Sequence, residues 1–333
     1  MASAEEAVRT RDLVKWYPKR DRPAIDGLTF SVARGEIFGL LGPNGAGKTT
    51  TIGVLTTRVV PTEGEVSVGG VDLLRDGAEA RRRLAVVSQY NNLDRGLTIH
   101  QNLLMHGLYH GLSRAVRRRR ADGLLDEMGL ADRAGAKVGQ LSGGQQQRVK
   151  IARALMHEPS VLFVDEPSTG LDPQSRLFVY DKLTALHARG VTVVITTHDM
   201  EEAARLCDRV GIMDHGRLIA LDTPKALTAS LPGGTAVDLA VDGDVRELAS
   251  ALAREPGVSS VETVGSAASA GSVGSAGEDT TGRLRLHTTA DPTPLLARVL
   301  RVIGEHGCEV RDVGVRRPSL EDVFIRLTGR GLR

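Results

Sequence analysis

The feature that most limits the fold is a glycine-rich run between an expected strand and an expected helix. Its residues fit the pattern G-x-x-x-x-G-K-[ST]: Gly42, Pro43, Asn44, Gly45, Ala46, Gly47, Lys48, Thr49 and Thr50. Ile37–Leu41, directly before the run, has the size of a buried strand. The glycines let backbone N–H groups turn inward around phosphate oxygens, and the positive end of the following helix points at them. We expect Lys48 to reach the β- and γ-phosphates of a nucleotide and Thr49 to ligate Mg²⁺.

A second apolar strand ends in two carboxylates. Asp165 and Glu166 directly follow Val161–Val164. An acid at the end of a buried strand is costly unless it meets a cation, so Asp165 suits the Mg²⁺ shell. Glu166 is placed to polarise the attacking water as a general base. Taken alone, the pair is equally well explained as solvated turn carboxylates, but the phosphate-binding loop favours a nucleotide-hydrolysing site.

Length and composition bound the class of protein. A chain of 333 residues exceeds what one hydrophobic core usually serves, so two domains are expected. Lys and Arg number 43 against 41 Asp and Glu, and this balance gives no reason to expect a nucleic-acid partner. The two cysteines lack metal-ligand spacing. No apolar run approaches the ~20 residues of a membrane helix, so any membrane role must act through a partner.

Residues 1–230 are predicted to form an α/β domain. Short apolar runs alternate with helical patterns, which indicates a parallel sheet covered on both faces. Arg11–Tyr17 and Leu28–Val32 alternate like strands of an antiparallel sheet. Leu97–Met128 reads as helix, broken near Gly111, and predicts a helical subdomain inserted at about residues 95–157. The runs expected in the parallel sheet, besides those named above, are Leu84–Ser88, Val191–Thr197 and Val210–Met213.

Residues 231–333 change in character. Strand, helix and strand follow one another twice, which is the α+β ferredoxin-like plan. Residues 265–282, between the two halves, are dominated by Gly, Ser and Ala and are expected to form a flexible loop. The expected elements are Val237–Val241, Val245–Arg254, Val258–Val264, Arg283–His287, Thr293–His306 and Glu309–Val315, with a closing helix at Leu320–Leu327.

A second anion site is predicted within the helical subdomain. In the run Leu141–Arg148, Ser142 and Gln145 have the spacing of a capping box. Gly143 and Gly144 leave the positive end of the helix bare, as an anion site needs. The simpler interpretation is a capped helix. Because the chain already holds a phosphate-binding loop, another molecule's nucleotide explains this second site better.

These motifs, in this order, resemble an ATP-binding-cassette ATPase from Arg11 to about Thr228. The run Leu141–Arg148 matches the family's signature sequence, and Gln89 matches its Q-loop glutamine. The remaining matches are the Mg²⁺-site carboxylate Asp165, the catalytic glutamate Glu166, the D-loop ending in Asp172, the switch histidine His198 and the adenine-stacking aromatic Tyr17.

The resemblance implies two cassettes arranged head to tail as a dimer, with ATP held between one subunit's phosphate loop and the other's signature. It implies catalytic roles for Glu166, His198 and Gln89, and Mg²⁺ ligation by Thr49, Gln89 and Asp165. Nucleotide contacts are implied for Tyr17, for the run Gly42–Thr50, for Ser142, Gly143, Gly144 and Gln145, and for Asp172. Ser142 and Gly144 are expected to contact the γ-phosphate in trans.

The chain's tail indicates one branch of the family. One cassette without a membrane span or a coiled-coil insertion favours a subunit at the cytoplasmic face of the membrane, bound to separate integral permease subunits. Arg317–Gly329 resembles the end of bacterial drug-resistance subunits of the daunorubicin-exporter type, so export of a drug, antibiotic or lipid-like substrate is favoured. Two alternatives stay open: an importer subunit with an amino-acid-sensing C-terminal domain, and a soluble cassette ATPase outside transport.

Overall fold

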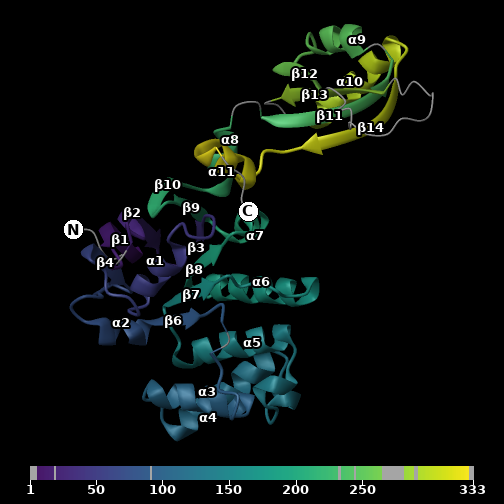
Figure 1. Ribbon diagram of the computed structural model, residues 1–333. Helices are drawn as coiled ribbons and strands as arrows, with labels where there is room; N and C mark the ends of the chain where they lie inside the picture. The colour runs from purple at the N-terminus through teal and green to yellow at the C-terminus, as the bar shows by residue number, and fades with distance from the viewer. Residues whose placement is uncertain are drawn as a thin grey trace, which may run out of the picture. The chain divides into compact units, whose positions relative to one another are not determined.

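The computed structural model describes residues 6–18, 20–90, 92–231, 234–243, 245–264, 281–288 and 292–329. It divides into two compact units (Figure 1), one formed by Met1–Pro224 with Phe324–Arg333 and the other by Lys225–Val323. From the sequence we expected residues 231–333 to form the second domain. In the structure, the second unit ends at Val323, and Phe324 groups with the first unit. Within the described ranges, every helix is too short or too polar to cross a membrane.

A six-stranded sheet forms the centre of the first unit, in the order β10-β9-β3-β8-β7-β6. Its neighbours from β9 to β6 run parallel, and β10 pairs antiparallel to β9 at one edge. Every residue of β3, β7 and β8 is buried, as expected for strands covered on both faces. The strands are β3 (Ile37–Leu41), β6 (Leu84–Val87), β7 (Val161–Asp165), β8 (Thr192–Thr197), β9 (Arg209–Asp214) and β10 (Arg217–Asp222).

The register brings the carboxyl ends of three central strands together. Leu41 at the end of β3 pairs with Thr197 of β8, and Thr196 pairs with Asp165 of β7. The phosphate-binding loop follows β3, Glu166 follows β7 and His198 follows β8. The parallel register therefore gathers the predicted catalytic residues at the carboxyl ends of the strands. Open α/β sheets bind ligands at this end.

An antiparallel sheet packs against the central one. Its order is β2-β1-β4-β5, and it shares a hydrophobic core with the central sheet. Phe30 of β2 stacks on Phe38 of β3, with ring centroids 5.3 Å apart. This sheet confirms the two antiparallel strands expected near the N-terminus and adds two more. Its strands are β1 (Glu6–Lys15), β2 (Ile25–Ala33), β4 (Glu63–Val68) and β5 (Val71–Asp72).

The inserted segment is helical and broken at the expected place. Gly111, with φ +75°, separates α3 (Ile99–Tyr109) from α4 (Arg114–Glu127). Side chains cap three of its helices, with Thr98 before α3, Ser113 before α4 and Ser142 before α5 (Gly143–Ala154). The first unit also contains α1 (Lys48–Leu55), α2 (Gly77–Arg83), α6 (Pro173–Ala188), α7 (Met200–Leu206) and the short 3-10 helices η1 (Ala131–Arg133), η2 (Val138–Gln140) and η3 (Leu155–His157).

The second unit has its own sheet, ordered β12-β13-β11-β14 with every pair antiparallel. Its element order is the strand–helix–strand repeat expected from the ferredoxin-like plan. Of the loop expected at 265–282, residues 265–280 lie outside the described residues, and residues 281–282 begin β13. The elements are β11 (Thr235–Asp242), α9 (Val245–Leu252), β12 (Ser260–Val264), β13 (Thr281–Thr288), α10 (Pro292–Glu305) and β14 (Glu309–Arg316), and α8 (Pro224–Ala229) and α11 (Leu320–Thr328) flank them along the chain.

Candidate nucleotide-binding site

The phosphate-binding loop requires glycine at two positions. Gly42 has φ +151°, and a Cβ on it would lie 2.3 Å from the carbonyl oxygen of Met213. Gly47, the N-cap of α1, has φ +108°, and a Cβ there would lie 2.5 Å from the carbonyl oxygen of Ala24. Within the described structure no side chain caps α1, so its positive end is open to an anion.

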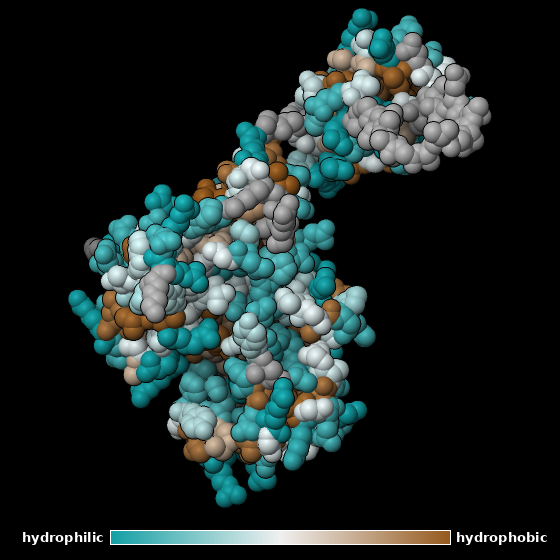
Figure 2. Space-filling model, viewed as in Figure 1, coloured by the Kyte–Doolittle hydropathy of each residue, from teal (hydrophilic) through white to brown (hydrophobic). Residues whose placement is uncertain are grey.

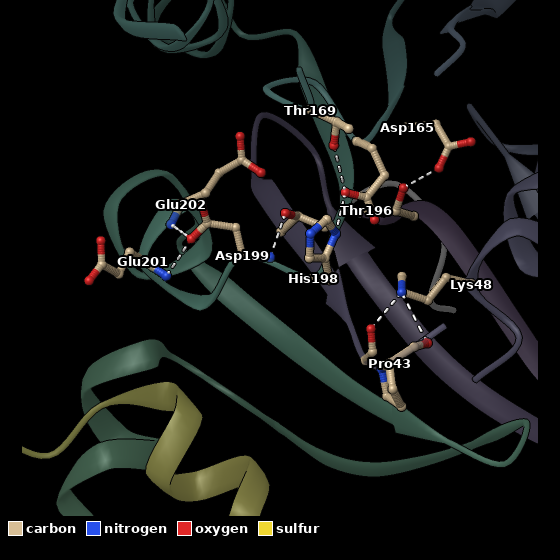
Figure 3. Close-up of polar contacts among 12 residues, drawn as sticks. Pro43, Lys48, Asp165, Thr169, Thr196, His198, Asp199, Glu201 and Glu202 are labelled. Atoms are coloured by element: carbon tan, nitrogen blue, oxygen red, sulfur yellow. Dashed lines mark hydrogen bonds and ion pairs between the residues drawn. The ribbon is translucent and has the colours of Figure 1, made fainter. Parts of the chain in front are cut away.

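Lys48 lies inside this loop. Its buried Nζ donates to the carbonyl oxygens of Gly42 at 2.5 Å and Pro43 at 3.2 Å (Figure 3). Burial lowers the pKa of Lys48, while the negative charges of Glu166 and Asp165 act in the opposite direction. The ammonium group is thus held among the loop's own carbonyls, close enough to both carboxylates to be attracted by them.

Asp165 ends β7 and is held by the neighbouring strand. The Thr196 hydroxyl donates to its Oδ1 at 2.5 Å, and the N–H of Glu166 donates to the carbonyl of Thr196 at 2.9 Å. Sequence reasoning missed Thr196, because a hydroxyl inside an apolar strand gives no signal of its partner. Asp165, Thr49 and Gln89 offer a carboxylate, a hydroxyl and an amide oxygen, which is the hard oxygen donor set that Mg²⁺ takes. These residues therefore fit the predicted metal.

Glu166 and His198 meet although 32 residues separate them. The Glu166 Oε2 accepts hydrogen bonds from His198 Nδ1 at 2.7 Å and from the Thr169 hydroxyl at 3.2 Å (Figure 3). Its backbone has φ +50°, in the left-handed region. Two donors thereby fix the orientation of the carboxylate predicted to act as the general base.

A cleft of about 770 Å³ joins the phosphate-binding loop to Glu166 and His198, and Asp165 is not among its described lining residues. The predicted residues that line it come from the phosphate-binding loop and from Gln89, Glu166 and His198. Tyr17 is not among the described lining residues, and the Lys15 ammonium lies 5.2 Å from its ring centroid, so adenine stacking by Tyr17 stays a prediction. Lining residues that the sequence did not reveal come from two turns without a motif: Arg20, Asp21, Arg22, Pro23, Ala24, His215 and Gly216.

The signature residues lie at the start of α5. Ser142 and Gln145 form the predicted capping box, with Ser142 Oγ accepting from the Gln145 N–H at 3.2 Å and Gln145 Oε1 from the Ser142 N–H at 3.0 Å. Ser142 and Gly143 are exposed, whereas Gly144 is buried. The described residues that line the cleft include none from Ser142–Gln145. A nucleotide contacted by the signature must therefore come from somewhere other than this chain's own cleft.

Asp172, the end of the D-loop, caps α6. Its Oδ1 accepts from the Ser175 N–H at 2.9 Å. Hydrogen bonds from Ser175 lower the pKa of Asp172. Like the signature, Asp172 is not among the described lining residues of the cleft. Its contact with a nucleotide therefore stays a prediction.

Comparison with known proteins decides the family. The ABC transporter family profile matches residues 25–169, a range that includes the phosphate-binding loop, the signature and Glu166. Daunorubicin resistance ATP-binding protein DrrA3 of Streptomyces coeruleorubidus is 40% identical over 93% of this chain and 92% of its own length. This chain belongs to the ATP-binding proteins of ABC transporters. The expected ATPase family and its α/β cassette fold are thereby confirmed.

Other ABC proteins show the same relationship. Nod factor export ATP-binding protein I of Rhizobium sp. (strain N33) is 40% identical over 93% of each chain. Linearmycin resistance ATP-binding protein LnrL of Bacillus subtilis (strain 168) is 36% identical over 98% of this chain and 99% of its own. A solved ATP-binding cassette, a dimer bound to ADP and Pi, aligns with a TM-score of 0.60 and 30% identity over 65% of this chain and 98% of that one.

Proposed function

We propose that this ABC ATP-binding protein hydrolyses ATP to power export through separate membrane subunits. The observation that carries the proposal is the pair Glu166–His198 in the same cleft as Lys48 and the phosphate-binding loop. Relatives named for daunorubicin resistance, linearmycin resistance and Nod factor export support an exporter, with a drug, antibiotic or lipid-like molecule as the substrate class.

The side chains divide the chemistry of hydrolysis. Lys48 and the backbone N–H groups of the loop neutralise the β- and γ-phosphates. Glu166 accepts a proton from the attacking water, and His198 orients Glu166 by donating to its Oε2. Thr49, Gln89 and Asp165 would hold Mg²⁺, which when bound neutralises charge between the phosphates. The products are ADP and phosphate.

A second copy of the chain completes the site. The exposed, capped start of α5 lies outside its own cleft, and the solved cassette bound to ADP and Pi is a dimer. We infer a head-to-tail homodimer in which Ser142 and Gly144 approach the γ-phosphate held by the partner.

An exposed apolar strip on α3 is the proposed contact with the membrane subunits. Met105, Leu108 and Tyr109 are 38%, 47% and 79% exposed, and their spacing places them on one side of the helix. Figure 2 shows a largely hydrophilic surface in which hydrophobic residues form small patches. Docking there would hold the protein peripherally at the cytoplasmic face of the membrane.

The dimer is tested with two substitutions. Glu166→Gln keeps the size of the side chain but removes the base, so ATP should bind and hydrolysis should stall. Light scattering with ATP and Mg²⁺ should then show a dimer. Adding Ser142→Arg places bulk and charge where the partner's phosphate must lie, so the double variant should bind ATP as a monomer. A double variant that dimerises as well as Glu166→Gln alone refutes the signature's role in trans.

Export is tested in the assembled complex. The chain is co-purified with a candidate membrane subunit, and ATPase activity is measured with candidate drugs. Drug-stimulated activity that disappears in the Glu166→Gln variant supports export. Stimulation by an external solute-binding protein instead would assign import.

A further inference from the structure

Three histidines gather away from the nucleotide-binding cleft. His106 lies on α3, His110 caps the same helix and His157 ends η3, directly after α5. One ring nitrogen from each lies within 4.8 Å of the others. His106 and His110 are four residues apart and share a helix face, whereas His157 approaches from a different element. The nucleotide site uses none of the three.

The hydrogen bonds leave ring nitrogens available inside the cluster. His157 Nε2 lies 2.9 Å from the carbonyl oxygen of Leu84, so it must carry the proton and donate. Its Nδ1 then carries the lone pair, and this atom is buried without a partner among the described residues, as is His106 Nε2. Buried polar atoms normally have a partner. A backbone carbonyl that accepts from the far nitrogen is also the usual support of a metal-binding imidazole.

The surroundings keep the imidazoles neutral. Burial, helped by neighbouring positive groups, lowers the pKa of His106 to about 3, and burial lowers that of His157 to about 4. Both rings are therefore uncharged at pH 7, which is the form that binds metals. The two arginines near the cluster each have a partner of their own. Arg153 donates to the backbone carbonyl of Asn92, and Arg120 forms an ion pair with Glu158 at 2.6 Å.

We propose that His106, His110 and His157 form a binding site for a divalent transition metal of the Zn²⁺ class, with water as the fourth ligand. Three imidazoles suit Zn²⁺, Co²⁺, Ni²⁺ and Cu²⁺ rather than Mg²⁺. The rings of His110 and His157 lie stacked, with centroids 3.6 Å apart and planes at 9°. Since a metal binds in the plane of each ring, at about 2.0–2.1 Å, the half-buried His110 rotates out of this stack on binding. The metal would then tie α3 to the segment that follows α5.

The experiment uses the full-length chain, stripped with a chelator and returned to chelator-free buffer. Co²⁺ titration should produce the visible absorption of a tetrahedral site that saturates at one equivalent per chain. Zn²⁺ should displace Co²⁺ and raise the melting temperature, and Mg²⁺ without nucleotide should do neither. This readout is independent of ATP hydrolysis, so it distinguishes the metal site from the proposed function.

Substitutions locate the bound ion. His110→Gln should weaken Co²⁺ binding at least about ten-fold, the lower range for disturbing a metal site, and His157→Gln should do the same. His100→Gln is the matched control, because His100 lies on α3 but pairs with Asp122. If His157→Gln fails to fold, His110→Gln decides alone, since no hydrogen bond joins the His110 ring to a buried carbonyl among the described residues. Equal binding by wild type and His110→Gln, or no one-equivalent binding by wild type, overturns the proposal.

Discussion

Gly144 has no room for a side chain. A substitution there tests whether the start of α5 packs as closely against α6 as the structure shows. A Cβ on Gly144 would lie 2.1 Å from Ser175 Oγ and 2.7 Å from Ser175 Cβ, at the start of α6. The hydroxyl could rotate away, but the Cβ is fixed to the backbone, so the two helix starts must separate. At the neighbouring Gly143 a Cβ would meet no described atom within 4 Å. Gly144→Ala and Gly143→Ala are therefore the same chemical change in opposite surroundings.

The expected magnitudes follow from these contacts. Overpacking costs about 1–3 kcal/mol, and replacing glycine by alanine in a helix returns about 0.5–1 kcal/mol. Gly144→Ala should thus lower the free energy of unfolding by about 1 kcal/mol, and by at most about 2.5 kcal/mol, whereas Gly143→Ala should leave it unchanged or slightly higher. Ser175→Gly removes both clashing atoms, so the double variant Gly144→Ala/Ser175→Gly should recover most of the packing loss.

Urea unfolding followed by tryptophan fluorescence measures the effect. Trp16 is the single tryptophan and lies in the first unit, so its signal reports on the unit that contains α5. The four proteins of the cycle, wild type, Gly144→Ala, Ser175→Gly and the double variant, give the coupling energy between the two positions. Equal stability of Gly144→Ala and Gly143→Ala, or a coupling energy near zero, refutes the packing argument.

Three further outcomes are expected. Lys48→Ala should abolish hydrolysis and weaken ATP binding, because the phosphates lose a confined cationic partner; near-normal turnover measured by phosphate release would contradict the site. A chain ending at Ser230 should still bind ATP in a fluorescent-nucleotide assay, because the described lining residues precede it, but it should melt earlier, because the buried Phe324 is lost. Burial raises the pKa of the Cys207 thiol, so iodoacetamide should label Cys207 far more slowly in the native protein than in urea. Comparable labelling rates would show that Cys207 is accessible to solvent in the native protein.

The central sheet could be predicted because its strands are buried on both faces. Ile37–Leu41 has the bounds expected from sequence, and Val161–Asp165 extends its prediction by one residue, since continuous apolar runs give an unambiguous signal. The strand Glu63–Val68 was not predicted, because two glutamates and a glycine in six residues leave no continuous apolar run. It is a strand because it pairs with β1, a contact that a local pattern does not reveal.

The site was predictable where its residues lie in compact motifs. Lys48, Glu166 and His198 follow buried strands and meet at one edge of the sheet, as their positions indicated. Thr196 and His215 were missed, because their roles depend on which strand or turn lies beside them. The cluster of His106, His110 and His157 likewise could not be predicted from the sequence, since His157 approaches from a different helix.

The left-handed backbone of Glu166 has a consequence for how the protein tolerates change. A non-glycine residue in this region costs about 1–2 kcal/mol relative to an ordinary conformation. Glycine would adopt the same φ of +50° without that cost, but it carries no carboxylate. Screening variants for thermal resistance alone should therefore enrich replacements at this position that keep the fold and lose turnover.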